Sequence, residues 1–273
     1  MKKPRPHPFR DSGQDIKATR RVPDTPQSVS PSYRLAFADQ DFLTREELRP
    51  VRLQLELLKP EMILDELGIK STIVMFGGAR IPADLAQAKT PQMAMLVPYY
   101  EEARRFAHAM TQRCIENGGS YGVVCTGGGP GVMEAGNKGA AQAGGVSLGL
   151  NIVLPHEQAP NPYVTPDLSF NFHYFAIRKM HFLMRAQAIC IFPGGFGTLD
   201  EMFEALTLIQ TGRMARVPVI LFGAAWWKSI INWGALADAG VIAPADLNLF
   251  VMVDRAEDAI AAIDAWPTVK ETA

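Results

Sequence analysis

The chain has 273 residues, of which 48% are hydrophobic and 20% are charged, and its formal net charge is −1 at pH 7. This composition leaves enough apolar residues for a sizeable core, in one large domain or two modest ones. No uninterrupted apolar stretch approaches the length of a membrane span, so we do not expect a membrane-embedded protein.

The charge is distributed unevenly along the chain. Residues 1–34 carry a net charge of +5 and the remaining residues a net charge of −6. The basic start also contains six prolines, which predicts a flexible arm over residues 1–40 and a single domain over residues 41–273. The arm lacks the interleaved aromatic residues of a nucleic-acid contact, so we expect a solvated tail.

The three cysteines, Cys114, Cys125 and Cys190, lack the spacing of metal ligands. Cys125 and Cys190 lie in apolar runs and are predicted to be buried thiols, which suits a reducing compartment. The N-terminal segment has no apolar stretch typical of a secretory signal. These features predict a cytoplasmic protein without a metal site.

The first predicted elements are a helix and a strand. Thr44 and Glu47 resemble a helix start, and leucines recur at helical spacing over residues 44–67, where Pro60 should interrupt or kink the helix. A strand is predicted over residues 71–76. A loop with a short helix follows over residues 81–97.

Helices and strands then alternate regularly to the end of the chain. The strands are apolar throughout, which is typical of a parallel sheet covered on both faces. The sequence therefore predicts a doubly wound, Rossmann-like α/β domain with about seven strands. The further strands are expected at 121–125, 146–150, 168–173, 188–192, 218–222 and 249–253, and the helices at 99–117, 132–143, 174–187, 202–210, 226–237 and 256–266.

Three glycine-rich turns follow predicted strands, namely Gly77–Gly78, Gly127–Gly131 and Gly194–Gly197. In sheets of this class, ligands bind outside the carboxyl ends of the strands. The second turn lacks the third glycine of the dinucleotide fingerprint, and no acidic residue follows at the end of the next strand. Classical NAD(P) binding is therefore not expected.

The third turn is the most informative part of the sequence. Pro193–Glu201 reads Pro-Gly-Gly-Phe-Gly-Thr-Leu-Asp-Glu and joins an apolar strand to a helix. Free backbone N–H groups and the helix dipole favour an anion there, and the glycines permit a phosphate to approach closely. The alternative is structural, since Thr198 and Glu201 also have the spacing of a capping box.

Charged residues flank the other predicted turns. Glu134 lies one turn into the helix after the second glycine turn, either as a surface acid or as a ligand contact. Arg178 and Lys179 open the helix that leads to the third turn. Cations near a helix start oppose its dipole, which favours an external anion, with a solvated helix end as the alternative. His181 on the same helix is expected to pack or be solvated.

These motifs resemble the LOG ("lonely guy") family of cytokinin riboside 5′-monophosphate phosphoribohydrolases, long labelled lysine decarboxylases. The resemblance rests on residues 193–201, on the pair Arg178-Lys179, and on Thr-Gly-Gly-Gly-Pro-Gly-Val-Met-Glu-Ala at 126–135. It covers roughly residues 70–255, and the run 149–158 resembles the longer bacterial members. Residues 1–65 have no counterpart in the short members.

The resemblance implies hydrolysis of the N-glycosidic bond of a purine nucleoside 5′-monophosphate, AMP or an N6-modified AMP, without a cofactor. Arg178 and Glu201 are the implied catalytic residues. The 5′-phosphate is expected on the 194–198 turn, Lys179 is expected to position the nucleotide, and Phe175 to pack against the base. The complete implied binding set is Gly78, Gly129, Gly131, Glu134, Phe175, Lys179, Gly194, Gly195, Gly197 and Thr198.

Two rival functions remain open at this point. One is a non-catalytic nucleotide or molybdenum-cofactor carrier, which retention of both Arg178 and Glu201 disfavours. The other is pyridoxal-phosphate decarboxylation, for which Lys179 is the nearby candidate Schiff-base lysine.

A homodimer or a higher homo-oligomer is also expected. Phe106, Met110, Phe175 and Phe182 on two of the predicted helices exceed what one sheet face needs, and the resemblance implies a two-fold contact there that completes the active site.

Overall fold

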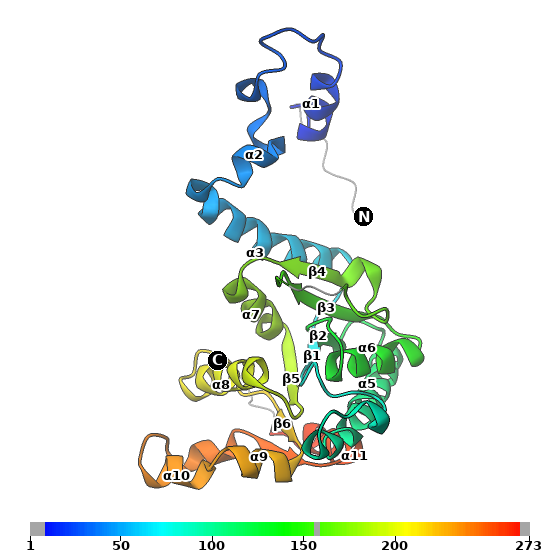
Figure 1. Ribbon diagram of the computed structural model, residues 1–273, viewed down its shortest axis with the longest axis vertical. Helices are drawn as coiled ribbons and strands as arrows, with labels where there is room; N and C mark the ends of the chain where they lie inside the picture. The colour runs from blue at the N-terminus through cyan, green and yellow to red at the C-terminus, as the bar shows by residue number, and fades with distance from the viewer. Residues whose placement is uncertain (1–8, 156–158, 268–273) are drawn as a thin grey trace. The chain divides into compact units, whose positions relative to one another are not determined.

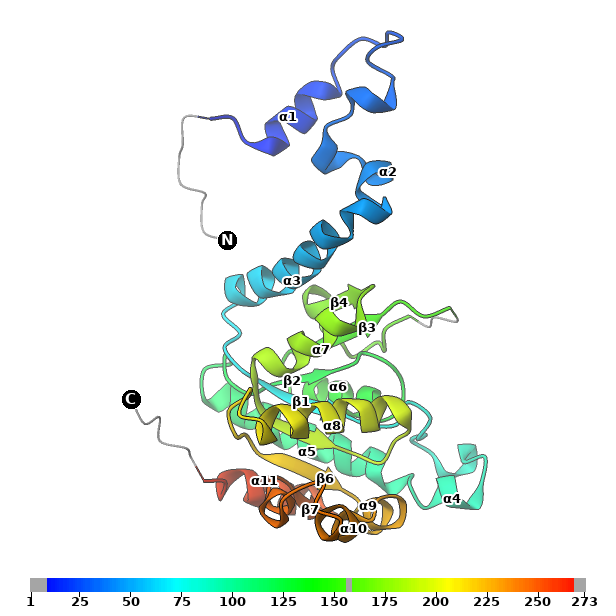
Figure 2. The same ribbon diagram turned by 90° about the vertical axis from the view of Figure 1, so that its left-hand side faces the viewer.

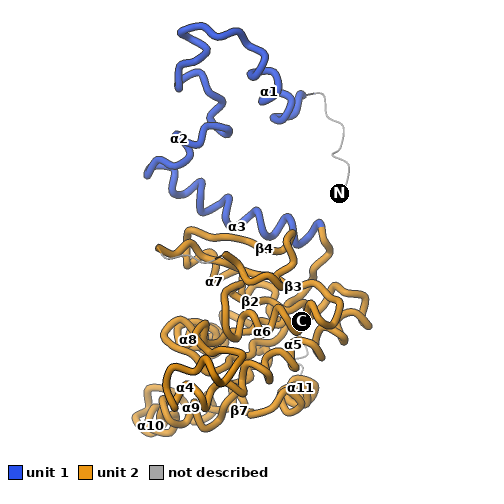
Figure 3. Tube along the Cα trace, turned by 45° about the vertical axis from the view of Figure 1, so that its right-hand side comes forward, with its two compact units in different colours: residues 1–66 blue, residues 67–273 orange. Residues whose placement is uncertain are grey.

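The computed structural model describes residues 9–155 and 159–267. The chain divides into two compact units, residues 1–66 and residues 67–273 (Figure 3). The described part of the expected arm contains a helix, α1 (Ser12–Thr19), whose Asp11 cap accepts a hydrogen bond from the backbone N–H of Gln14. The division into an arm over residues 1–40 and a domain over residues 41–273 stays a prediction.

The longest helix of the first unit is α3 (Arg49–Glu66). The predicted start at residue 44 is wrong, because a separate short helix, α2 (Gln40–Leu43), uses Thr44 as its C-cap. Pro60 lies inside α3 and does not interrupt it, so the predicted break is wrong, whereas the alternative of a kink stays a prediction. The proline ring is buried, so packing offsets the backbone hydrogen bond that a proline cannot donate.

The second unit is built on seven strands. They are β1 (Thr72–Phe76), β2 (Val123–Thr126), β3 (Ser147–Ile152), β4 (Ser169–Phe172), β5 (Ala186–Ile191), β6 (Val219–Phe222) and β7 (Val251–Val253). All pair in parallel, in the order β4-β3-β2-β1-β5-β6-β7 (Figure 1). Every residue of β1, β2 and β6 is buried. The predicted doubly wound α/β fold is confirmed.

Helices cover both faces of this sheet. Figure 1 shows α7 (Phe175–Met184) and α8 (Phe196–Gln210) on one side, and α5 (Pro98–Glu116), α6 (Val132–Gln142) and α11 (Ala256–Asp264) on the other. The core includes Phe106 of α5 and the stacked rings of Phe192 and Phe222, whose centroids lie 4.0 Å apart. The predicted buried thiols Cys125 and Cys190 are confirmed.

The remaining helices of the second unit are short. They are α4 (Pro91–Ala94), α9 (Ala224–Ile230) and α10 (Trp233–Asp238), visible at the lower edge of the domain in Figure 2. The single helix predicted over residues 226–237 is therefore two helices, because the Asn232 side chain caps a new start by accepting from the Ala235 N–H. Among the described residues, no helix is long and apolar enough to cross a membrane.

The sheet has its topological switch point beside β1. The chain proceeds outward from β1 to β4 and then returns to β5 on the opposite side of β1. Connections that leave neighbouring strands in opposite directions open a crevice at their carboxyl ends, and ligands of doubly wound sheets bind there. Two of the three glycine-rich turns follow β1 and β5, and the third follows β2.

Candidate functional site

The three glycine-rich turns meet at the carboxyl edge of the sheet. The N–H of Gly78 donates to the carbonyl of Pro193 at 2.9 Å, and the carbonyl of Gly78 accepts from the N–H of Val132 at 3.3 Å. The turn after β1 thus joins the turn after β5 to the start of α6. The convergence predicted from the strand pattern is present in the structure.

The capping-box interpretation of Thr198 and Glu201 is wrong. The helix α8 begins at Phe196, with Gly195 as its N-cap and no side chain capping it. Thr198 is therefore the third residue of the helix, and Glu201 lies in its second turn. Because the first N–H groups of a helix have no intrahelical acceptor, the start of α8 presents uncapped donors.

The glycines of this turn differ in what the fold requires of them. A Cβ on Gly194 would collide with the Thr198 hydroxyl and lie 3.0 Å from the Gly78 nitrogen. A Cβ on Gly195 or Gly197 would meet nothing within 4 Å, and neither residue has a left-handed backbone. Packing within the chain explains why residue 194 is a glycine. It does not explain why residues 195 and 197 are glycines, because both border open space.

The glycines after β2 are required by their surroundings. A Cβ on Gly127 would lie 2.7 Å from an Nη atom of Arg178, so this glycine makes room for the guanidinium. Gly128 and Gly131 adopt φ of 72° and 68°, where other residues are strained, and a Cβ on Gly131 would collide with the Gly78 carbonyl. Gly129 faces the flexible end of Met133.

A buried amide network holds the same turn in place. The Asn161 Nδ2 group donates to the carbonyls of Gly128 and Gly129 at 3.1 and 3.0 Å, and to Oδ1 of Asn137 at 2.9 Å. The Thr126 hydroxyl donates to the same oxygen of Asn137 at 2.7 Å. Sequence reasoning missed both asparagines, because Asn161 lies in a long loop with no motif to mark it.

Arg178 extends from the first turn of α7 to the end of β3. Its Nε donates to the carbonyl of Leu150 at 2.7 Å, and its guanidinium carbon lies 5.0 Å from the centre of the Phe182 ring. Burial lowers the pKa of this guanidinium, while Glu201 and Cys125 oppose the shift. An arginine stays protonated under such shifts, so a fixed positive charge lies beside the Gly127 turn.

Glu201 is a buried carboxyl on α8, with 7% of the residue exposed. Burial raises the pKa of this carboxyl to about 7. The cations Lys179 and Arg178 oppose the rise, and the neighbouring carboxylates Glu204 and Asp200 add to it. Glu201 therefore exchanges a proton near neutral pH in a water-poor setting, which is typical of catalytic carboxyls.

Lys179 is already bound to α8. Its Nζ lies 2.8 Å from an oxygen of Asp200 and 3.1 Å from an oxygen of Glu204. Burial alone would lower the pKa of this amine, but the bonds to the two carboxylates outweigh burial and raise it. Lys179 thus fixes α7 against α8 on either side of Glu201, and its predicted contact with a nucleotide stays a prediction.

Two further predicted residues have clear surroundings. The half-buried Glu134 carboxylate accepts a hydrogen bond from the Tyr100 hydroxyl at 2.8 Å, which links α6 to α5. Phe175 starts α7 and is 52% exposed, and Phe196 at the start of α8 is 93% exposed. Glu134 has an internal role, whereas the two rings offer apolar surface at the helix starts.

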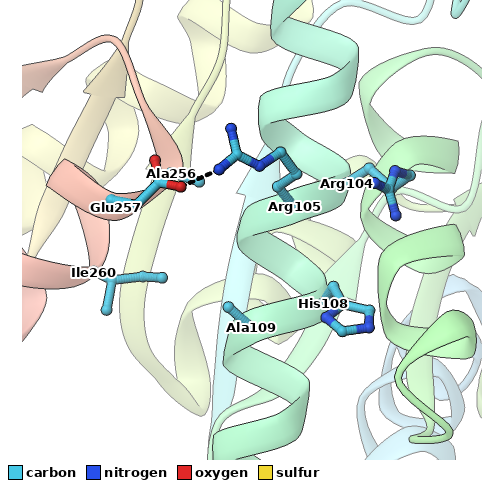
Figure 4. A pocket seen from close by; sticks show the side chains of 7 residues that line it. All are labelled: Arg104, Arg105, His108, Ala109, Ala256, Glu257 and Ile260. Carbon is cyan, nitrogen blue, oxygen red and sulfur yellow. Dashed lines mark hydrogen bonds and ion pairs between the residues drawn. The ribbon is translucent and has the colours of Figure 1, made fainter.

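A separate pocket of about 360 Å³ lies between α5 and α11 (Figure 4). Its arginines are neutralised, since Arg105 pairs with Glu257 and Arg104 with Glu101. None of the glycine-rich turns contributes to it. The pocket is lined by Arg104, Arg105, His108, Ala109, Ala256, Glu257 and Ile260. Among the residues that the structure describes, no cluster of His, Cys, Asp and Glu could hold a metal ion.

Comparisons with known proteins agree with the motifs. A family model described as "Possible lysine decarboxylase" matches residues 133–263. A cytokinin riboside 5′-monophosphate phosphoribohydrolase of Mycobacterium tuberculosis is 33% identical over 86 residues, 31% of this chain and 46% of the relative. Another of that name from Arabidopsis thaliana is 29% identical over 91 residues, 33% of this chain and 42% of the relative. The chain thus spans less than half the length of each of these curated relatives.

Solved structures are similar over more of the chain, the following among them. The molybdenum cofactor binding protein of the phototrophic bacterium Rippkaea orientalis is 20% identical, with a TM-score of 0.45, over 72% of this chain and 96% of that one. The residues that the family model matches include Arg178, Glu201 and the turn between them. Over this region the chain is thus similar to the LOG family, whose model still has the older lysine decarboxylase description.

Proposed function

We propose that this protein hydrolyses the N-glycosidic bond of a purine nucleoside 5′-monophosphate, releasing the free base and ribose 5-phosphate. The observation that carries the proposal is the meeting of a buried carboxyl, Glu201, and a half-buried cation, Arg178, beside the uncapped start of α8. The names of the two curated relatives support the same reaction class.

The 5′-phosphate would bind at the start of α8. The first turn has donors without intrahelical acceptors, and the helix dipole favours an anion at this end. Gly195 and Gly197 leave open space next to these donors, where a side chain would obstruct a phosphate. The turn is held by the hydrogen bond from the Gly78 N–H to the Pro193 carbonyl, and Gly194 lacks a Cβ that would crowd the Gly78 nitrogen.

Glu201 would act on the sugar in its ionised form. Cleavage of the bond between C1′ and the base leaves the electron pair on the base and positive charge on the ribose ring. A carboxylate in a water-poor site stabilises such charge strongly, and it can also orient the water that attacks C1′ and accept its proton. The hydroxyl of this water adds to C1′, and the proton that Glu201 accepted is balanced by the one that the departing base gains, which regenerates the carboxylate. Arg178 would stabilise negative charge on the phosphate or the departing base.

The base would meet the aromatic surface at the start of α7. Phe175 is half exposed there, three residues before Arg178, and can stack on a purine. AMP and an N6-modified AMP of the cytokinin type are the proposed substrates, which would give the protein an AMP nucleosidase activity or a place in cytokinin biosynthesis.

A homodimer through α7 and α8 forms part of the proposal. The earlier argument from Phe106, Met110 and Phe182 is wrong, because all three are buried within the chain. Exposed apolar side chains on these two helices supply a better reason, since large exposed apolar surfaces mark interaction sites. They are Phe175, Met180, Met184, Phe196 and Phe203.

Pyridoxal-phosphate decarboxylation receives no support from the site. A Schiff-base lysine must become a neutral amine, whereas the ion pairs of Lys179 raise the pKa of its ammonium group. Absorbance of the purified protein near the pyridoxal-phosphate band tests this directly, and we expect none.

The proposed reaction is tested by incubating the protein with a panel of nucleoside 5′-monophosphates and separating the products by chromatography. We expect release of a purine base together with ribose 5-phosphate. Tight nucleotide binding without base release from any member of the panel would contradict the proposal and indicate a carrier protein instead.

A further inference from the structure

Asn161 binds the turn after β2 from a distant part of the chain. Its backbone N–H donates to the Gly128 carbonyl at 2.8 Å, and its Nδ2 group donates to the carbonyls of Gly128 and Gly129 at 3.1 and 3.0 Å. The Gly128 N–H in turn donates to the Thr126 hydroxyl at 3.0 Å. The position of this turn therefore depends on Asn161 as well as on β2.

Asn137 determines which way the Asn161 amide points. Asn137 is fully buried, and its Nδ2 group donates to the Ser147 hydroxyl at 3.0 Å and to the Leu148 carbonyl at 3.2 Å. A carbonyl can only accept, so Oδ1 of Asn137 faces away from it and accepts from the Nδ2 group of Asn161 at 2.9 Å. Oδ1 of Asn161 accepts from the Tyr163 N–H at 3.2 Å. These partners hold both amides in one orientation.

The guanidinium of Arg178 lies against the same turn. A Cβ on Gly127 would be 2.7 Å from one of its Nη atoms, so the guanidinium packs directly on this glycine. Its other contacts are the Leu150 carbonyl, 2.7 Å from Nε, and the Phe182 ring, whose centre lies 5.0 Å from the guanidinium carbon. A shift of the turn would therefore open space beside the guanidinium.

We propose that Asn161 is a positioning residue that acts through Arg178. Together with Asn137, it holds the turn Gly127–Gly129 against the guanidinium and so fixes the place of this positive charge. The catalytic consequence rests on the function proposed above, whereas the effect on the Arg178 side chain does not. A charge that is already in place stabilises a transition state without reorganisation.

A displaced guanidinium would also change the surroundings of Glu201. Arg178 and Lys179 of α7 lower the pKa of this carboxyl, whereas Asp200 and Glu204 of α8 raise it. If Arg178 moves away, one of the two cations acts more weakly and the pKa rises above about 7. A loss of global stability alone would not move this pKa, so it separates a positioning role from a merely structural one.

Asn161→Ala tests the contact with Arg178 directly. The substitution removes the amide and keeps the backbone N–H that binds Gly128, so we expect a folded protein. Hydrogen exchange of the Arg178 Nε–H group is followed by ¹⁵N NMR of the full chain, and the signal is assigned by its absence in Arg178→Lys. We expect exchange that is faster by at least about tenfold, because the loosened guanidinium opens more often.

Ser71→Ala is the matched control at the opposite edge of the sheet. The Ser71 hydroxyl donates to Oε1 of Gln187 at 2.5 Å and accepts from the Gly122 N–H at 3.0 Å, so it links segments at the starts of β1, β2 and β5. Its removal also breaks polar contacts between strands, but it leaves the Gly127–Gly129 turn intact. We expect a lower Tm with unchanged Nε–H exchange.

The same variants are compared as enzymes. For Asn161→Ala we expect kcat for base release to fall by at least about tenfold, since misplacing a group by about 1 Å can cost about 100-fold in rate. We also expect the rising limb of its pH profile to move to higher pH. Ser71→Ala should keep both the kcat and the limb of the unmodified protein.

Unchanged Nε–H exchange in a folded Asn161→Ala protein would overturn the proposal, whatever its activity. Faster exchange in a protein that releases no base from any nucleotide would support the positioning of Arg178 and contradict the proposed function alone. Faster exchange with an unchanged kcat and pH limb would overturn the catalytic consequence.

Thr126→Val provides a second variant should Asn161→Ala fail to fold. It keeps the shape of the side chain and removes the hydroxyl that accepts from the Gly128 N–H and donates to Asn137. The same faster exchange of the Arg178 Nε–H group is expected, and exchange as slow as in the unmodified protein would overturn the proposal.

Discussion

At the scale of single residues, Glu201 lowers the stability of the folded protein when it is ionised, and the ionised form is the one proposed to act on the sugar. Its carboxyl is buried, and its pKa of about 7 is above the ordinary value of 4.5. Between these two values, the unfolded chain ionises this group and the folded chain does not. Stability due to Glu201 is therefore lost as pH rises from 4.5 to 7 and stays low above that range.

Replacing this carboxyl should make the protein more stable at alkaline pH. Each unit of pKa shift corresponds to about 1.4 kcal/mol. We expect Glu201→Gln to raise Tm at pH 8 by at least about 3 °C, because the amide has no charge to desolvate. Near pH 4.5 the two proteins should melt alike. Equal Tm values for both proteins at pH 8, measured by calorimetry, would mean that the carboxyl is well solvated.

Lys179 should set the pH at which the site becomes active. If the ionised form of Glu201 is required, kcat/KM rises with pH through about 7. Lys179→Met removes a cation that opposes the raised pKa, while Asp200 and Glu204 remain as like charges and Arg178 as the remaining cation. We expect the rising limb of the pH profile to move to higher pH.

The control for this profile is Lys228→Met, which removes an exposed lysine on α9. It should leave the limb in place. A Lys179→Met profile that keeps its midpoint but loses binding would instead favour the direct nucleotide contact predicted from the sequence.

The sequence marks some of these residues but not others. Arg178 and Glu201 stand in recognisable motifs, and the structure brings both to the same edge of the sheet. Asn137 and Asn161 could not be found this way, because their roles depend on a loop folding back onto the Gly128 turn. A hydrogen bond between distant segments leaves no local pattern.

At the scale of elements, the start of α8 is the decisive feature. Gly197 lies in the first turn of the helix, where alanine is the better helix former by about 1 kcal/mol. A Cβ there meets nothing within the chain. We expect Gly197→Ala to raise Tm by roughly 2–4 °C and yet to raise KM for a nucleoside monophosphate, because the methyl group enters the proposed phosphate space.

Gly234→Ala is the matched control, a helical glycine in α10 with ordinary surroundings. It should give a similar gain in Tm with unchanged kinetics. A Gly197→Ala protein that is more stable and fully active would show that the phosphate does not bind at the start of α8.

Element types were predictable, whereas several boundaries were not. Runs of apolar residues, several of them followed by glycine-rich turns, identify all seven strands. The capping-box spacing of Thr198 and Glu201 is misleading, because the chain turns into a helix already at Phe196 and leaves both residues inside it. Pro60 is likewise misleading, since tertiary packing overrides a local preference that favours a break.

At the scale of the whole molecule, the exposed apolar side chains of α7 and α8 predict an assembly. We expect Met184→Glu to halve the mass measured by light scattering, because the charge would be buried against a second copy. Activity should fall with the mass if the partner completes the site. Ile115→Glu on α5, an equally exposed apolar position on the other side of the sheet, should change neither.

An unchanged mass for Met184→Glu would contradict the contact between copies through α7 and α8. The site would then be formed by one chain, and the exposed Phe196 would contact the substrate and not a second copy. The assembly as a whole was predictable only in outline. Sequence patterns identify apolar helices, but they do not say which apolar residues the chain itself covers, as Phe106 and Phe182 demonstrate.

The most direct measurement compares AMP with adenosine as substrates, with base release followed by chromatography. The account predicts that AMP yields adenine and ribose 5-phosphate, that kcat/KM for adenosine is lower by at least about 100-fold, and that Glu201→Gln binds AMP without releasing adenine. Remote binding energy from the phosphate is expected to support the chemical step. Equal kcat/KM values for the two substrates, or normal turnover by Glu201→Gln, would contradict it.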